Sequence, residues 1–226
     1  PVHLPILAVT GVGLLIIGLL SWCLSNPLVD WSTLRAERVA VNLALAAGIG
    51  GLLPLTYTWF ATSKPDPLMA ARGSSAALVA ACAGAPFFSP LATLCLGAIV
   101  GLLVPLACYL VDHVLRWDDP TAALTVHGLG GALGLIAVGL LADGKAGQGW
   151  NGVGATGYLG LDGQGVSALW VAEGFLPDWP GQLAAQAVGL AAIALFGFAI
   201  AGLAFGPLAA ATAILRRRSE ASEAAD

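Results

Sequence analysis

Charged residues are scarce in this sequence. Asp, Glu, Lys and Arg together make up 10% of the 226 residues, whereas hydrophobic residues make up 58% and the mean hydropathy is +0.87. A soluble domain carries about 25% charged residues, which cover its water-facing surface. This chain has too few to do so. The composition therefore excludes a soluble globular domain and indicates an integral membrane protein in contact with a lipid bilayer.

The scarcity is concentrated in long stretches that contain no charged residue. A helix needs roughly 20 apolar residues to cross a bilayer, and the prolines Pro86 and Pro90 divide the longest stretch into two. Strands of a membrane barrel would alternate polar and apolar residues, and these segments do not. We therefore predict an all-α integral membrane protein with about six transmembrane helices. The predicted spans are residues 4–24, 39–61, 69–87, 90–112, 121–142 and 181–214.

The sequence also lacks the residue groups that catalysis or metal binding needs. The four cysteines lie in apolar segments without CxxC spacing, and we interpret them as small buried hydrophobic residues. No acid–base pair, nucleophile arrangement or metal-ligand set stands out. We therefore expect no enzyme, no cofactor, no metal site and no nucleic-acid partner. The cysteines are Cys23, Cys82, Cys95 and Cys108.

Basic residues give an expected orientation. Arg216, Arg217 and Arg218 follow the last span, and Lys and Arg favour the cytoplasmic side of a membrane. With six spans both termini would be cytoplasmic, which puts six of the nine Lys and Arg residues on that side. We expect residues 1–215 to form a transmembrane domain in the cell (inner) membrane and residues 216–226 a cytoplasmic basic, polar tail. Because the chain begins at Pro1 and enters a span at once, we also expect sequence upstream of it.

What the chain has in abundance is glycine. The 30 glycines and many alanines let helix backbones approach closely, which is the main route to helix association in lipid. The longest connection, residues 143–180, is rich in glycine, net acidic and carries Trp150, Trp170 and Trp179. We interpret it as an extracytoplasmic loop with interfacial aromatic residues.

One ionisable residue stands inside an apolar span. His127 lies between Val126 and Gly128, in a stretch without charge from Pro120 to Ala142. An ionisable residue in a membrane span points to function. A neutral imidazole donates a hydrogen bond from one nitrogen and accepts at the other, which suits a small, neutral, hydrogen-bonding permeant. The alternative is a packed histidine bonded to backbone or to Thr125.

The residues around His127 carry a family resemblance. The segment LRWDDPTAALTVHGLGGALGLIAVGLLADG resembles the tenth transmembrane helix of the ammonium transporter (Amt/Rh) family. Other segments resemble the sixth to eighth helices and the start of the eleventh, in the family's order, so the resemblance covers the second half of the family fold. The positions that match in the tenth helix include Asp118, Asp119, Gly128, Gly131 and Gly134.

The resemblance implies a trimer of eleven-helix subunits, each with a narrow apolar pore between two inverted halves. Two histidines, on the fifth and tenth helices, share a hydrogen bond in that pore and are thought to pass ammonia. His127 matches the second of them, and Asn42 matches a family asparagine. With Thr125, and with Trp22 as a possible substitute pore aromatic, these are the expected pore or substrate residues.

Several family pore positions differ in this chain, which leaves two main hypotheses open. Ala122 replaces a third acidic residue, the eighth helix lacks a threonine, and the sixth lacks the usual aromatic pattern. The first hypothesis is an ammonium or ammonia channel whose other half is upstream or on another chain. The second is a non-conducting half-transporter, an accessory or structural subunit of a larger membrane complex. A sensor ranks last, because the short tail holds no regulatory module.

Overall fold

The computed structural model describes residues 3–25, 36–146 and 164–223, and from residue 214 onward it describes the backbone only. The chain divides into two units, Pro1–Gln186 and Ala187–Asp226, each of which is described by itself. Residues 147–163 of the connection, which include Trp150, and the end of the tail at 224–226 lie outside the described residues.

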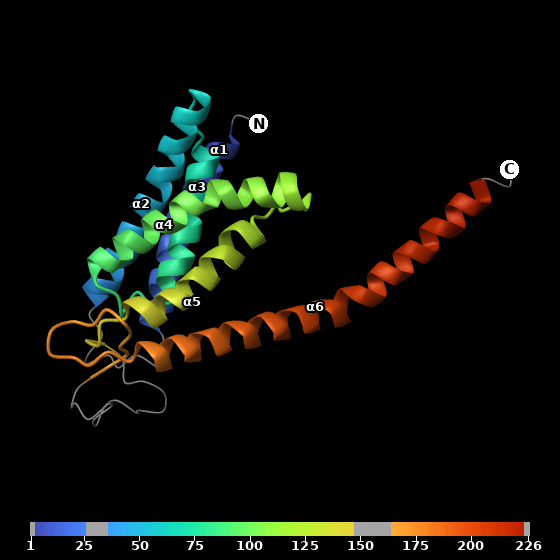
Figure 1. Ribbon diagram of the computed structural model, residues 1–226. Coiled ribbons are helices and arrows are strands. Elements are labelled where there is room, and N and C mark those ends of the chain that lie inside the picture. The colour runs from blue at the N-terminus through green and yellow to red at the C-terminus, as the bar shows by residue number, and fades with distance from the viewer. Residues whose placement is uncertain (1–2, 26–35, 147–163, 224–226) are drawn as a thin grey trace. The chain divides into compact units, whose positions relative to one another are not determined.

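The described residues form helices joined by short turns (Figure 1). They contain no strand, only the isolated bridges Phe88–Ala142 and Asp143–Ser167. The all-α prediction is therefore confirmed. In chain order the α-helices are α1 (Leu4–Leu24), α2 (Ala36–Thr62), α3 (Pro67–Cys82), α4 (Pro90–Tyr109), α5 (Leu129–Leu141) and α6 (Trp179–Glu223), and the π-helices are η1 (Leu110–Leu115) and η2 (Ala123–Gly128).

Five segments are long and apolar enough to cross a membrane: α1, α2, α4 with η1, η2 with α5, and α6 as far as Ala213. The third predicted span, 69–87, was too long at its C-terminal end. Helix α3 has 16 residues, about 24 Å at 1.5 Å per residue, against a hydrocarbon core of about 30 Å. It ends at Cys82 because the chain turns there, with the Gly84 carbonyl accepting from the Phe87 and Phe88 N–H groups.

Helix α6 is longer than the predicted span 181–214. It has 45 residues and contains Pro207, which corresponds to about 68 Å of helix. That length exceeds the hydrocarbon core by more than a factor of two. The backbone of the polar tail therefore continues the last span as helix up to Glu223.

Two of the helices begin at strong start signals. Asp66 precedes α3, and its carboxylate accepts the Leu68 N–H at 2.9 Å. Ser89 precedes α4, and its hydroxyl accepts the Ala92 N–H at 3.2 Å. In both helices proline follows the cap, at the position where a missing N–H costs nothing. The predicted break at Pro86 and Pro90 is confirmed.

Helix α3 is the centre of the first unit. It packs against α1, α2, α4, α5 and η2, and Figure 1 shows it between α2 and α5. Apart from Leu78, the residues that it buries against the neighbours are all small. These residues are Ala71, Gly73, Ala76, Ala77, Ala80 and Ala81.

Backbones touch where α3 meets its neighbours. A Cβ placed on Gly50 of α2 would lie 2.3 Å from the Ala77 Cβ and 2.9 Å from the Gly73 carbonyl oxygen. On the other side, a Cβ at Gly130 would lie 2.6 Å from the Ala76 oxygen, and one at Gly134 would lie 2.5 Å from the Ala80 oxygen. Glycine is therefore required at these positions for α2 and α5 to pack on α3.

We expect Gly50→Ala to lower the free energy of unfolding by roughly 1–3 kcal/mol, because the added methyl group overpacks the α2–α3 contact. Gly48→Ala is the matched control on the same helix, where an added Cβ meets no atom within 4 Å. That variant should be neutral or slightly stabilising. Thermal unfolding in detergent, followed by circular dichroism, measures both. Equal midpoints for the two variants would contradict the packing argument.

Candidate functional site

A groove of about 640 Å³ runs between α1, α3 and η2. Most of its lining is aliphatic, contributed by α1 between Leu4 and Leu15 and by Leu68 and Met69 of α3. Among the described residues that line it there is no Phe, Tyr or Trp. The polar and charged lining residues are Asp66, Arg72, Ser75, Thr121 and His127.

His127 lies in the last turn of η2 and is exposed on the wall of this groove. On the α3 side, Arg72 is half-buried, and its guanidinium donates to the Cys108 Sγ at 3.4 Å. The groove therefore combines an apolar floor with one imidazole, one guanidinium and the Asp66 carboxylate. An apolar lining with a small number of polar groups at defined positions is typical of sites that bind small molecules.

Asp119 fixes the entrance to the helix that carries His127. Its carboxylate accepts the Leu124 N–H at 3.3 Å, and the Thr125 N–H and hydroxyl at 3.0 Å and 2.9 Å. Burial acts to raise the pKa of Asp119, but the hydrogen bonds from Thr125, Leu124 and Ala123 outweigh it and hold the pKa below its ordinary value. The carboxylate therefore accepts from N–H groups in the first turn of η2, which begins at Ala123.

Thr125 is buried and its hydroxyl donates to Asp119, so it does not line the groove. The described hydrogen bonds of Thr125 go to Asp119, and none of them joins Thr125 to His127. Trp22 is 70% exposed near the C-terminal end of α1, whereas the groove uses α1 only as far as Leu15. The structure therefore does not bring Trp22 or Thr125 together with His127 in this groove.

The expected signature residues divide into packing and exposed positions. Gly134 contacts the α3 backbone, whereas an added Cβ at Gly131 would meet no atom within 4 Å. Gly128 and Asp118 are exposed, beside His127 and Asp119 respectively. Of this group, only Gly134 is fixed by a close approach of two backbones.

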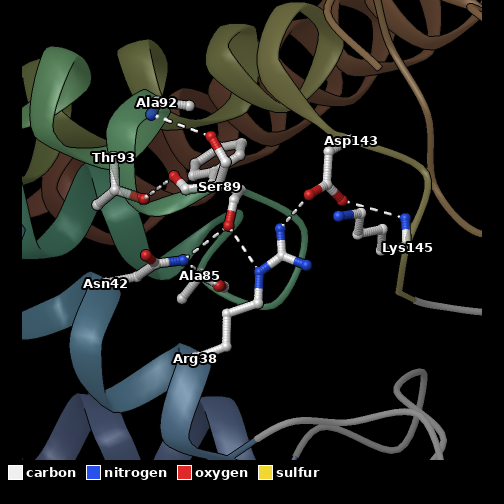
Figure 2. A network of polar contacts seen from close by, with 9 residues as sticks. Arg38, Asn42, Ala85, Ser89, Ala92, Thr93, Asp143 and Lys145 are labelled. Atoms are coloured by element: carbon white, nitrogen blue, oxygen red, sulfur yellow. Dashed lines mark hydrogen bonds and ion pairs between the residues drawn. The ribbon is translucent and has the colours of Figure 1, made fainter. Parts of the chain in front are cut away.

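Asn42 belongs to a second polar network, away from His127 (Figure 2). It is fully buried, and its Nδ2 donates to the carbonyl oxygens of Ala85 at 2.8 Å and Phe88 at 2.9 Å. Arg38, one turn earlier on α2, donates to the same Phe88 oxygen at 2.8 Å and forms an ion pair with Asp143 (Figure 2). The amide thus holds the turn between α3 and α4, while the guanidinium joins that turn to the segment after α5.

Comparison with known proteins identifies the family. The model of the Ammonium Transporter Family matches residues 1–226. The chain belongs to the Ammonium Transporter Family. The family is one of transporters rather than enzymes, and the apolar helices of this chain agree with a multi-pass membrane protein.

Two curated relatives illustrate the sequence match. Ammonium transporter Amt2 of Archaeoglobus fulgidus is 35% identical over 114 residues, which are 50% of this chain and 24% of that protein. Ammonium transporter 2 of Schizosaccharomyces pombe is 38% identical over 112 residues, 49% of this chain and 22% of that protein. The matched part of this chain spans about a quarter of the length of the curated relatives.

Solved structures show the same fold. A Sensor Amt Protein superposes with a TM-score of 0.60 at 24% identity and covers 76% of this chain and 36% of its own. Candida albicans Mep2 gives a TM-score of 0.58 at 25% identity and covers 75% of this chain and 34% of its own. The predicted membership of the ammonium transporter family is confirmed.

Sequence reasoning missed two sets of residues in this ammonium transporter fold. Arg72 lines the groove beside the predicted histidine, and its signal was a single arginine inside the predicted span 69–87. Arg38 and Asp143 form an ion pair although 105 positions separate them. Arg38 and Asp143 each lie at the edge of a stretch without charged residues. That placement was the sequence signal that could have pointed to the ion pair.

Replacing Asp119 tests the capped helix entrance. We expect Asp119→Ala to lower the free energy of unfolding by about 2 kcal/mol, because three donors lose a charged acceptor. Asp118→Ala, which changes the exposed neighbour, should have little effect. Chemical denaturation in detergent over a pH series measures both. Because the folded pKa is depressed, the Asp119 contribution is present above pH 3.8 and is lost as the pH falls through the lower folded pKa. A wild-type advantage over Asp119→Ala that persists at the lowest pH would contradict this assignment.

Breaking the Arg38–Asp143 pair tests the second network. Both side chains are largely buried, 14% and 8% exposed, so Arg38→Gln should cost about 3 kcal/mol of unfolding free energy by leaving a carboxylate unpaired. The double variant Arg38→Gln/Asp143→Asn should recover part of that loss. Lys145→Gln is the control, since Lys145 contacts Asp143 through its backbone N–H. A double variant less stable than Arg38→Gln alone would refute the pairing.

Proposed function

We propose that this chain supplies one wall of an ammonia-conducting pore and that His127 is a pore histidine in it. The groove between α1, α3 and η2 is that wall. The observation that carries the proposal is the exposure of the His127 imidazole on a groove whose remaining lining is mostly aliphatic. Family membership supports ammonium transport as the activity.

The lining suits a neutral permeant better than a charged one. An aliphatic surface cannot replace the hydration shell of a cation, so ammonium would enter at a high cost. A neutral imidazole both donates and accepts a hydrogen bond, which matches ammonia. Arg72 adds a positive charge to the groove, and this charge disfavours a second cation nearby. We therefore propose that ammonium loses its proton before passing this wall.

The opposite wall of the pore must come from residues other than those lining the groove. We propose that it is supplied by another segment of the same transporter or by a partner subunit, and that the complete transporter is an oligomer in the lipid bilayer. We also propose an inner-membrane location with both ends of this chain on the cytoplasmic side, as the basic residues predict. Asn42 and Thr125 then support the helices rather than line this groove, and Trp22 lies exposed outside it.

Transport of methylammonium tests the role of His127. The complete transporter containing His127→Ala should take up labelled methylammonium about tenfold more slowly, which is the loss of roughly one hydrogen bond to the permeant. His113→Ala is the matched control, because His113 of η1 stacks on Tyr109 of α4 and does not line the groove. Uptake that is unchanged in His127→Ala, at equal amounts of protein in the membrane, would remove the pore role.

A second function is a non-conducting accessory subunit. The described lining of the groove contains no Phe, Tyr or Trp, and Arg72 places a fixed charge in it. Both features favour this alternative. It predicts that the wild-type protein gives no uptake above background and co-purifies in fixed stoichiometry with other membrane subunits. Uptake above background that depends on His127 would exclude it.

A further inference from the structure

Two cysteines far apart in the sequence lie together between α1 and α3. The Cys23 Sγ and the Cys82 Sγ are 3.3 Å apart, although 59 positions separate the residues. Cys23 is the penultimate residue of α1 and Cys82 is the last residue of α3. The Cys23 thiol also lies 3.7 Å from the Cys82 carbonyl oxygen. We propose that Cys23 and Cys82 form a disulfide that fastens α1 to α3.

The surroundings separate this pair from the other cysteines. Cys23 is buried and Cys82 is partly exposed, so one thiol is accessible to a reagent while the other is held beside it. Cys95 is exposed on α4, where the expectation of a buried residue was wrong because it points away from the packed face. Cys108 is buried against the Arg72 guanidinium. Neither has another described thiol as a hydrogen-bonding neighbour.

The position of the pair gives the bond a mechanical role. Cys23 is the one buried residue among the 21 of α1, whereas α3 is packed on several sides. The contact between these thiols is therefore the most enclosed point of a helix whose other residues are partly or fully exposed. A disulfide there would tether the least enclosed helix of the first unit to its centre. The same two helices form the groove, so the bond would limit how far α1 can move from α3.

The chemistry requires a disulfide-bearing oxidant. The Cys82 thiolate attacks a sulfur of the oxidant, which forms a mixed disulfide and releases one thiolate. Cys23 then loses its proton and attacks the Cys82 sulfur, which forms the Cys23–Cys82 bond and releases the second thiolate. The two cysteines lose two electrons, and the oxidant is reduced to two thiols. The sulfurs must approach from 3.3 Å to about 2.05 Å.

The inference does not rest on transport. In the orientation proposed above, the C-terminal ends of α1 and α3 both lie toward the extracytoplasmic side. Disulfides form and persist in that compartment. A reduced pair would therefore encounter an oxidising environment through the partly exposed Cys82.

Thiol counting tests the proposal in membranes that contain the complete transporter. The background is Cys95→Ser, which removes the exposed thiol and leaves three cysteines in this chain. After treatment with oxidised glutathione, this chain should lose two of its three maleimide–polyethylene glycol adducts under denaturing conditions. Dithiothreitol should restore them. Peptide mass spectrometry should find residues 23 and 82 in one disulfide-linked peptide.

The controls use the same background. Cys108→Ser should lose the same two adducts as its parent, whereas Cys23→Ser should yield no linked peptide and leave Cys82 free or bound to glutathione. If Cys23→Ser fails to fold, the linked peptide in the parent still decides the question. Three adducts remaining after oxidation of folded protein would overturn the proposal. Glutathione on Cys82 without a linked peptide would overturn it as well.

Discussion

Direct contact between helix backbones at α3 is the constraint on which the first unit depends. Gly50 brings α2 against Ala77 and Gly73, and Gly130 and Gly134 bring α5 against Ala76 and Ala80. In lipid no hydrophobic force drives these helices together, so close packing and hydrogen bonds must do it. Gly130 comes three residues after His127 on a continuous helical path. The glycine contact that packs α5 on α3 therefore also sets where the imidazole meets the α3 wall of the groove.

Polar contacts fix this helical path at both of its ends. At the start, Asp119 accepts from Leu124 and Thr125. At the end, Asp143 pairs with Arg38, which also binds the Phe88 carbonyl. The first set pairs N–H groups that a helix start leaves unpaired, which are costly to leave unpaired near lipid. The second pairs two side-chain charges and the Phe88 carbonyl in the turn before α4. The apolar residues between these two ends need no polar contact to hold the helix. The His127 side chain makes none of the described hydrogen bonds.

Length and hydropathy were sufficient to predict most of the fold, but not the details that tertiary contacts decide. The bounds of α1 were predicted correctly because its apolar run has clear ends. The end of α3 was missed because a turn at Gly84 sets it, within a stretch that is apolar on both sides. The pore role of His127 stays a prediction, and neither the groove that it lines nor the exposed position of Trp22 was predicted. An evenly apolar helix carries no periodic signal for the face that it presents. Contacts such as Cys23 with Cys82 depend on helix placement, which spacing along the chain does not reveal.

Ala122 shows how a changed residue can alter the groove without removing a local backbone turn. It lies where the family resemblance implies an acidic residue, and it adopts a left-handed conformation with φ 55°. Alanine gains nothing from that conformation, whereas Asp or Asn is better tolerated there. The turn is therefore maintained by the contacts on either side, with the Ala122 N–H donating to the Asp119 carbonyl and the Ala122 carbonyl accepting from Val126. The substitution leaves a groove-lining position without a carboxylate, so Asp66 is the one carboxylate among the described lining residues to face the charge of Arg72.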